Sequence, residues 1–525
     1  MLKIVQKVIL LGLLLIPMPA LAEVPAQFMA KLYTEALGRA PDSGGWAAKI
    51  DYFNRYGCTS TTVKDQVKAA LTSPEFNNLG YNNAAKVLLL YRTALDREPD
   101  ANGFNLYLGQ LNAGVPYSTV IQSVLNSSEF NSLMSYYICS GGPYFFNALG
   151  QGSYAIAIPG VPSISQADLQ ASLNAAGPGG TVALPNMTVV ALNSTLTIPA
   201  GVTLTTTGSP LPTSHGMMAR LVRGPSYSGG EAMVKLISGA RLTNLWIDGQ
   251  RGALPNARNP GASGPFVQNE INIQSLSGAN NQITDNFIAN TAGWSSMQVL
   301  GVSETGVACQ ANVISRNLIT AYASNNDRAI GNTWSDGISN ACEDSVVSNN
   351  SIIDATDGAI VLFRAQVNGV GAVQHSQVTD NIILNAGNSA YVGIAIDPLY
   401  VTGGCSAQPS FAGSYVGRNA FWTGPKAIVE IGLAVGTAEW FYSHGGCIGT
   451  GANVSDNTTN GFRANVNTGI AIQGMLDVTV QRNNLLVDHK DKGNCPALDV
   501  PAGVSAGLAS GSIQSYVDVG MVDCI

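Results

Sequence analysis

One arrangement of apolar and polar positions returns along the second half of the chain. It consists of an apolar residue, two residues of any kind, Asn, one further residue and a second apolar residue. The copies are Ile283-Asn286-Ile288, Ile314-Asn317-Ile319, Val347-Asn350-Ile352, Val378-Asn381-Ile383, Val454-Asn457-Thr459 (with a weaker end) and Val480-Asn483-Leu485. The first four Asn lie 31, 33 and 31 residues apart, a period typical of stacked repeats. Alternating Val and Ile favour strands, so we predict stacked coils with an Asn ladder at one corner.

A second repeated pattern falls between the copies of the first. It is Gly followed by alternating small and branched residues, as in Gly393-Ile394-Ala395-Ile396, Gly432-Leu433-Ala434-Val435 and Gly469-Ile470-Ala471-Ile472, with Gly337-Ile338 and Gly358-Ala359-Ile360 as earlier members. We interpret these segments as one strand per coil, stacked in one parallel sheet whose crossovers are the other strands of each coil. The predicted fold of 165–525 is an all-β right-handed parallel β-helix, a solenoid.

The segment 23–138 has a helical period instead, and it contains two repeats 58 residues apart. Their shared positions are Leu32-Tyr33, Ala36-Leu37, Arg39 and Pro41-Asp42, then Leu90-Tyr91, Ala94-Leu95, Arg97 and Pro99-Asp100. Apolar residues at i, i+1, i+4 and i+5 indicate one buried helix face, which Pro-Asp and Gly should end. Ser73 and Ser128 are predicted N-caps of a later helix in each repeat. We therefore predict a small all-α domain.

The shared signature LY-x-x-AL-x-R-x-PD-x-x-G resembles a family of unknown function that is repeated in secreted and surface-layer-type bacterial proteins. The resemblance covers about 110 residues. It implies association with a cell surface or matrix and implies no chemistry. We interpret Arg39 and Asp42 as fixing the turn between helices, with a ligand role as the alternative.

After a Gly/Pro-rich linker at 139–164, the chain carries three motifs that resemble the opening of the pectate-lyase-like superfamily. They are an amphipathic segment at 164–176 followed by GG-T-V-x-LP, then I-P-x-G-V-T-L at 198–204, and N-L-x-I-D-G at 244–249. The resemblance implies the β-helix fold with a capping helix. It leaves the activity open, because lyases, hydrolases, epimerases and phage depolymerases share this architecture. The Gly-His-Gly of pectin hydrolases is absent, and Asp397-Pro398 is followed by Leu399 rather than by the His of alginate-active members.

Residues 1–22 have the form of a bacterial secretory signal peptide, with Lys3 and Lys7, an apolar run and Ala20-Leu21-Ala22 before the cleavage point. Its removal takes the formal charge from −7 to −9. We expect a secreted protein, extracellular, at the cell surface or in the periplasm, with no later membrane span. An exported chain with an even number of Cys favours disulfides. Proximity in sequence suggests the pairs Cys58–Cys139, Cys309–Cys342, Cys405–Cys447 and Cys495–Cys524.

Candidate chemistry comes from aligning the Gly-centred strands. The alignment places Ser296, Asp336, Asp357, Val392, Ile431 and Thr468 in one outward-facing column. Asp336 and Asp357 would then lie on neighbouring rungs, about 4.8 Å apart. Such a pair can act as general acid and base in glycoside hydrolysis or hold Ca²⁺ as a cofactor. The alternative is that each Asp-Gly makes a turn before its strand.

Other residues around this column suit a polysaccharide. Trp294 and Trp334 precede Ser296 and Asp336 by two residues, and as exposed rings they would bind sugar faces. Asp327 and Arg328 lie in the loop before Trp334. Arg364 and Asp397, at the ends of two strands, are further catalytic candidates.

Two functions follow from these patterns. The first is a secreted enzyme, a lyase or a glycoside hydrolase, that acts on an extracellular polysaccharide through the acidic and aromatic groove. The second is a non-catalytic β-helical surface or matrix protein that binds glycan and is anchored by the helical repeats. Charged residues make up only 11% of the chain and no basic cluster occurs, which argues against a nucleic-acid partner.

Overall fold

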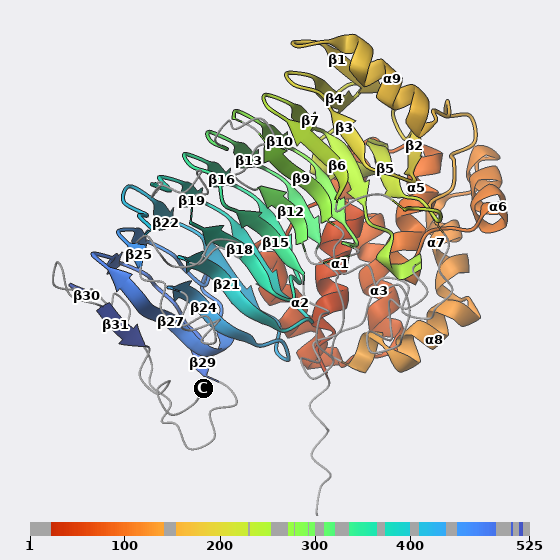
Figure 1. The fold of residues 1–525 in the computed structure, drawn as a ribbon. Coiled ribbons are helices and arrows are strands. Elements are labelled where there is room, and N and C mark those ends of the chain that lie inside the picture. The colour runs from red at the N-terminus through yellow and green to blue at the C-terminus, as the bar shows by residue number, and fades with distance from the viewer. Residues whose placement is uncertain are drawn as a thin grey trace, which may run out of the picture.

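The computed structural model describes residues 23–140, 154–228, 232–253, 271–277, 279–291, 293, 295–299, 309–320, 335–364, 373–398, 409–436, 449–489, 506–507 and 514–517. The signal peptide predicted at 1–22 lies outside these ranges. The described chain consists of a long stack of strands with a group of helices along one flank (Figure 1). The predicted fold, a right-handed parallel β-helix preceded by an all-α region, is confirmed.

The strands form three sheets, of 11, 8 and 12 strands over the described residues. Sheet A contains β1 (Thr181–Leu184), β4 (Thr203–Thr206), β7 (Arg241–Thr243), β10 (Gln282–Thr284), β13 (Val313–Ser315), β16 (Val346–Ser348), β19 (Gln377–Thr379), β22 (Tyr415–Gly417), β26 (Asn453–Ser455), β28 (Thr479–Gln481) and β30 (Ala506–Gly507). Sheet B contains β2 (Val189–Leu192), β5 (Ala219–Arg223), β8 (Leu245–Asp248), β11 (Phe287–Ala289), β14 (Leu318–Thr320), β17 (Ser351–Ile353), β20 (Ile382–Asn385) and β23 (Ala420–Thr423). Sheet C contains β3 (Leu196–Ile198), β6 (Ala232–Ile237), β9 (Ile271–Ser277), β12 (Ser295–Val299), β15 (Asp336–Asn340), β18 (Gly358–Phe363), β21 (Ala390–Asp397), β24 (Val429–Val435), β27 (Ala464–Leu476), β25 (Gly449–Thr450), β29 (Val487–His489) and β31 (Gln514–Val517). The pairings between these strands are parallel except those of β30 and β31.

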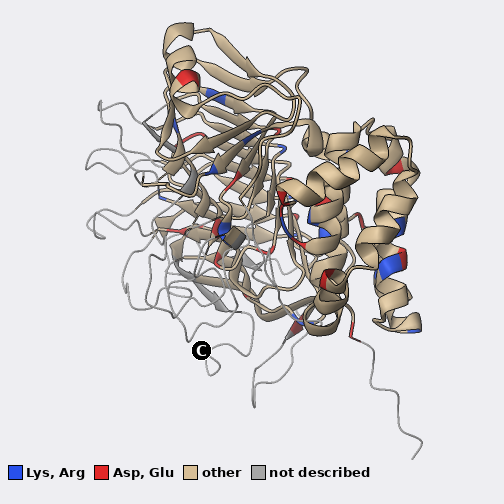
Figure 2. Cartoon of the chain, turned by 90° about the vertical axis from the view of Figure 1, so that its right-hand side faces the viewer, with Lys and Arg blue, Asp and Glu red and all other residues tan. Residues whose placement is uncertain are grey.

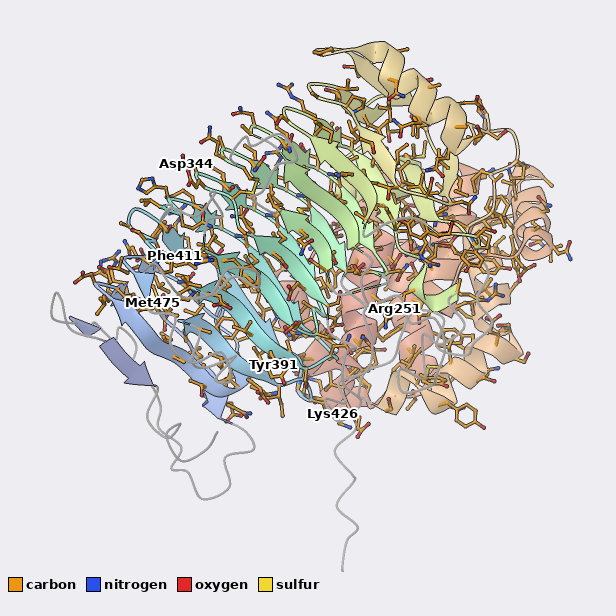
Figure 3. The ribbon with its side chains drawn as sticks, in the orientation of Figure 1. Arg251, Asp344, Tyr391, Phe411, Lys426 and Met475 are labelled. Atoms are coloured by element: carbon orange, nitrogen blue, oxygen red, sulfur yellow. A yellow bond between two sulfur atoms is a disulfide. The ribbon has the colours of Figure 1, made fainter. Side chains whose placement is uncertain are left out.

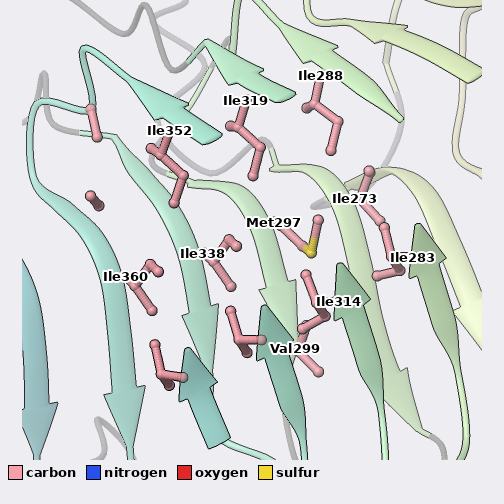
Figure 4. Close-up of a cluster of buried hydrophobic side chains, with 14 of the residues drawn as sticks. Ile273, Ile283, Ile288, Met297, Val299, Ile314, Ile319, Ile338, Ile352 and Ile360 are labelled. Carbon is pink, nitrogen blue, oxygen red and sulfur yellow. The ribbon is translucent and has the colours of Figure 1, made fainter. Parts of the chain in front are cut away.

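The coils from β1 to β24 each contribute one strand to each sheet, and the apolar side chains of all three sheets meet inside. In sheet C, Ile338 pairs with Ile360, and Ile360 pairs with Ile394. Ile338 and Ile360 face Ile319 and Ile352 of sheet B across the core (Figure 4). The Gly-centred segments therefore form one stacked sheet, as predicted.

The predicted capping helix covers the first coil. Helix α9 (Gln166–Ala176) buries Leu169 and Leu173 against the same core. Ser165 begins the helix, because its side chain accepts from the Asp168 N–H at 3.1 Å. The amphipathic segment thus closes one end of the apolar interior.

The predicted Asn ladder is present at the corner between sheets A and B. The Oδ1 of Asn350 accepts from the backbone N–H and the side-chain amide of Asn317, at 3.1 and 2.9 Å. The Nδ2 of Asn350 donates to the carbonyl of Ile314 at 3.0 Å and to Asn381. The ladder continues through Asn419, which the sequence interpretation missed although Val416, Asn419 and Phe421 match the pattern. Every Asn from 286 to 483 in the ladder is buried.

The residue before each ladder Asn adopts a left-handed backbone conformation, with φ between 53° and 63° from Asp285 to Arg482. These turn residues form a second ladder of bidentate ion pairs. Its members are Asp285–Arg316, Asp380–Arg418 and Asp456–Arg482, with N···O distances of 2.6–2.9 Å. Asp285 is largely buried, but Arg316 and both partners of the other two pairs are in contact with solvent, which screens the pairs. Each pair therefore contributes little to stability.

The helical region comprises α1 (Ala26–Leu37), α2 (Ser43–Tyr56), α3 (Ser60–Leu71), α4 (Pro74–Asn78), α5 (Asn83–Leu90), η1 (Tyr91–Leu95), α6 (Ala101–Asn112), α7 (Tyr117–Leu125), α8 (Ser128–Tyr136) and η2 (Ile138–Ser140). The cap of α4 is Ser73, as predicted. Two details correct the prediction. The Pro-Asp element begins a helix rather than ending one, because Asp42 accepts from the Gly45 N–H at 2.7 Å and caps α2. The cap of α8 is Ser127 rather than Ser128.

The signature residues hold each repeat together. Arg39 forms a bidentate pair with Glu75 and donates to Asp42. Arg97 makes the equivalent bonds to Glu129 and Asp100. The interpretation that Arg39 and Asp42 fix the turn between helices is confirmed.

The repeats pack on the outer face of sheet B. One buried apolar cluster unites both parts, and sheet B contributes Trp246, Phe287, Ala289, Leu318, Ile353, Leu384 and Trp422. Helix α1 runs across the rungs. Gln27 near its start donates to Asp354, whereas Gly38 at its end lies against Pro212. A Cβ at Gly38 would lie 1.9 Å from the Pro212 carbonyl oxygen, and φ there is +61°, so both close approach and conformation require glycine.

Two of the predicted disulfides, Cys58–Cys139 and Cys309–Cys342, are present. The other two predicted pairs involve cysteines outside the described residues. Charged residues are thinly scattered over the ribbon (Figure 2). Within the described ranges, no helix has the length and hydropathy needed to cross a membrane.

Candidate functional site

The first group of candidate residues lies where β15 begins, on the outer face of sheet C. Ile338 points into the core (Figure 4), so its neighbour Ser339 faces outward. The Ser339 hydroxyl donates to Oδ2 of Asp336 at 2.6 Å, and the Gly358 N–H donates to Oδ1 at 2.9 Å. Ser295, which pairs with Asp336 on the preceding rung, lies 3.3 Å from Ser339 between hydroxyl oxygens. We call Ser295, Asp336, Ser339 and Gly358 the Asp336 cluster.

The Asp336 carboxyl holds its proton unusually well. Burial raises its pKa to about 6, against the two hydrogen bonds, which lower it. The side chain is nonetheless half-buried rather than enclosed. A carboxyl of this kind is partly protonated in mildly acidic solution and can deliver a proton to a bound molecule.

The strand register corrects the predicted column at two positions. Ser295, not Ser296, pairs with Asp336, and Gly358, not Asp357, pairs with Val392. The pairing of Val392, Ile431 and Thr468 is as predicted. The error has a simple cause. Ala359 takes the place that Gly393 and Gly432 hold in later strands, so aligning Gly358 with Gly393 shifts that strand by one residue.

The corrected register places Asp357 in a different column. Continuing the pairs Gly358–Val392 and Val392–Ile431 by one residue aligns Asp357 with Tyr391 and Glu430. All three side chains are half-buried, and Tyr391 is labelled in Figure 3. Asp357 and Glu430 are two strands apart, which corresponds to about 10 Å along the stack. The sequence interpretation missed Tyr391 and Glu430, although each stands two residues before a Gly of the repeated pattern.

The remaining predicted residues are only partly described. Arg364 follows β18, and its backbone N–H donates to the carbonyl of Asp397, the last residue of β21, at 3.0 Å. Arg364 is half-buried, whereas Asp397 is 1% exposed. Trp294, Trp334, Asp327 and Arg328 lie outside the described residues, and their proposed contact with sugar stays a prediction.

The calcium role predicted for Asp336 and Asp357 stays a prediction. Calcium takes about six to eight oxygen ligands, and in this structure both oxygens of Asp336 accept hydrogen bonds from the protein. In the described ranges, no group of three or more His, Cys, Asp or Glu could hold a metal ion. We therefore derive no step through a metal.

A cavity of about 180 Å³ lies elsewhere, inside the first helical repeat, between Tyr33, Arg39, Lys49 and Glu75. Arg39 pairs with Glu75, and Lys49 donates to Gln66 at 2.7 Å. Burial lowers the pKa of Lys49 to about 8. Because these charged groups are bonded to residues of the same repeat, they are weaker candidates for catalysis or ligand binding than the residues on the outer face of sheet C.

Comparison with known proteins gives limited similarity. A family model described as a domain of unknown function (DUF4214) matches residues 67–134. No curated protein matches the chain. Among solved structures, an endo-xylogalacturonan hydrolase from Aspergillus tubingensis is 14% identical, with a TM-score of 0.40, over 67% of this chain and 100% of that one. An alginate lyase from a Paenibacillus species is 14% identical, with a TM-score of 0.27, over 62% of this chain and 98% of that one. The Dettilon tailspike protein is 13% identical, with a TM-score of 0.32, over 60% of this chain and 66% of that one. Similarity at this level says nothing about activity, and the fold assignment rests on the three sheets.

Proposed function

We propose that the protein is a secreted enzyme that hydrolyses glycosidic bonds of an extracellular polysaccharide on the outer face of sheet C. The observation that carries the proposal is the Asp336 carboxyl, only half-buried and with a pKa raised to about 6, beside a column that contains Asp357, Tyr391 and Glu430. Disulfides in both parts of the chain support an oxidising compartment.

Asp336 and Asp357 have different roles in this reaction because their environments differ. Asp336 donates its proton to the glycosidic oxygen as the bond from the anomeric carbon breaks. Asp357, on the neighbouring rung, acts as base or nucleophile, so that water supplies the hydroxyl added to the anomeric carbon and returns a proton. Glu430 and Tyr391 bind neighbouring sugar units, the tyrosine through its ring face.

Hydrolysis is favoured over elimination because Asp336 and the column of Asp357, Tyr391 and Glu430 supply carboxyl groups rather than cations. A lyase acting on a uronate needs a group to neutralise the sugar carboxylate and a base to remove the proton beside it. Among the described residues at these strand ends, Arg364 is the candidate for the first task. The acid pair needs no such group.

The experiment uses purified full-length protein and a panel of neutral and acidic polysaccharides. We expect new reducing ends without the ultraviolet absorbance of unsaturated uronates, and a rate that falls as pH rises through about 6, because Asp336 must be protonated. Asp336→Asn should lower the rate at least about 100-fold. Asp344→Asn, at an exposed position in the connection from β15 to β16 (Figure 3), is the control and should leave the rate unchanged.

A second function, glycan binding without chemistry, is favoured by one observation. The Ser339 hydroxyl and the Gly358 N–H donate to the two oxygens of Asp336, so this carboxyl already has a structural role in linking the first residues of β15 and β18. Retention of a polysaccharide on the protein with no release of reducing ends or unsaturated products would establish binding and contradict the hydrolase.

A further inference from the structure

The two helical repeats differ at the positions that face the coils. Between 31–40 and the equivalent 89–98, five pairs of positions carry a charge in one repeat and not in the other: Lys31 and Leu89, Thr34 and Arg92, Glu35 and Thr93, Gly38 and Asp96, Ala40 and Glu98. The charged members of these pairs are all buried. The shared signature builds the repeats themselves, as the Arg39–Glu75 and Arg97–Glu129 pairs show. The charged residues that are not shared therefore have a different task from the signature residues.

Three of these charged residues meet sheet B in one ionic network. Arg92 donates to Glu35 at 2.7 Å, to Glu98 at 2.5 Å and to Asp248 of β8 at 3.3 Å. Glu98 in turn accepts from Arg220 of β5 at 2.6 and 3.1 Å. No side chain in the network is more than 1% exposed.

An aromatic ring completes the contact. The guanidinium carbons of Arg92 and Arg220 lie 4.5 and 4.2 Å from the centre of the Trp246 ring. The Trp246 indole N–H donates to Asp248 at 3.2 Å. One arginine comes from the repeats and the other from the coils, so both parts build the same cluster.

Separation would break the ion pairs between the two parts and expose apolar surface. Glu98 would lose Arg220 and Arg92 would lose Asp248. Sheet B would expose the row from Trp246 through Phe287 to Leu318. Soluble proteins rarely expose an apolar patch of this kind. Burial raises the pKa of Glu98, but the nearby Arg220 and Arg92 charges outweigh it and hold that pKa below its ordinary value.

We propose that the helical repeat pair is a docking module that recognises and covers the outer face of sheet B, and that Glu35, Arg92 and Glu98 carry the recognition. Its partner is defined by chemistry: the outer face of a parallel β-helix sheet that presents a tryptophan between an arginine and an aspartate. In this chain the partner is in the same polypeptide. This face of the repeats is therefore occupied and does not bind a cell surface.

The test uses the full chain with a protease site introduced between residues 141 and 153. The disulfide Cys58–Cys139 lies within the repeats and Cys309–Cys342 within the coils, so neither joins the two parts. After cleavage, we expect both fragments to elute together from a sizing column at physiological salt. Separation of the wild-type fragments would overturn the proposal.

Two variants locate the recognition. Glu98→Lys should weaken association at least 100-fold, and Arg220→Met provides an independent change on the coil side that should weaken it in the same direction. Glu129→Gln, in the repeat-internal pair with Arg97, is the control and should leave the fragments together. Equal retention in all three variants would contradict the assigned role of the network. Because glycan hydrolysis is not measured, this result is independent of the proposed function.

Discussion

Among single residues, environment rather than residue type separates the acids of this chain. Asp336 is the first residue of β15, and Asp380 follows the last residue of β19. The hydrogen bond and charge of Arg418 lower the pKa of Asp380, whereas burial raises that of Asp336. The proposed proton-donor role therefore suits Asp336 and does not suit Asp380.

The raised pKa of Asp336 predicts a pH-dependent stability. The folded state binds this proton more tightly than the unfolded chain, so the contribution of Asp336 to stability is fully present below about pH 4 and is lost as pH rises to about 6. We expect a loss of about 1–2 kcal/mol, reduced by partial solvent screening. Chemical denaturation of wild type and Asp336→Asn over this window should show a smaller loss in the variant. Equal slopes would contradict the assigned pKa.

Among the secondary-structure elements, the Asn ladder holds successive coils in register. Between the two ends of the ladder, each side-chain amide group donates to the Oδ1 of the next Asn and to a backbone carbonyl, and its own Oδ1 accepts from the preceding Asn. Removing one side chain therefore breaks hydrogen bonds to two neighbouring rungs. Ladder spacings vary from 26 to 38 residues, which shows that coils of unequal length still align their corners.

Replacing a ladder residue should therefore cost more than replacing its neighbour. Asn350→Leu leaves the Asn317 N–H and side-chain amide without their acceptor, and we expect a loss of about 1–3 kcal/mol in the free energy of unfolding. Asn349→Gly is the control, because Asn349 is exposed and has a φ of 56°, which glycine adopts without strain. Denaturant unfolding of both variants measures the difference, and equal losses would refute the ladder's role.

For the molecule as a whole, the shared apolar cluster and the ionic network join the repeats and the coils. Lys426, labelled in Figure 3, adds a contact at the foot of the helices, donating to the Ser140 carbonyl at 2.8 Å and pairing with Glu23. A molecule built this way should unfold as a unit over the region that sheet B shares with the helices.

Breaking the network should lower that common transition. Arg92→Met leaves Glu35 without its bidentate partner, and we expect a loss of about 3–5 kcal/mol. Scanning calorimetry should show helices and coils melting together at a lower temperature in the variant. Two well-separated transitions in the wild type would show that the parts are independent.

Features that depend on local or periodic chemistry could be predicted from the chain alone. Alternating apolar residues predicted the strands, the repeated Asn predicted the corner ladder, and the segment at 164–176 predicted the capping helix. Two cysteine pairs close in sequence were also correct. These features follow from patterns that recur along the chain or lie within one short segment, so a few residues suffice to reveal them.

The placement of Asp357 and the role of the helical repeats depend instead on long-range packing. Strand register across coils of unequal length depends on pairing along the whole strand, and a single Ala359 in a Gly column shifted the alignment by one residue. Glu35, Arg92 and Glu98 look like surface charges in sequence. Their burial depends on Arg220 and Asp248, which lie more than 100 residues from Arg92 and Glu98 in the chain, and pairing over that distance leaves no local pattern to read.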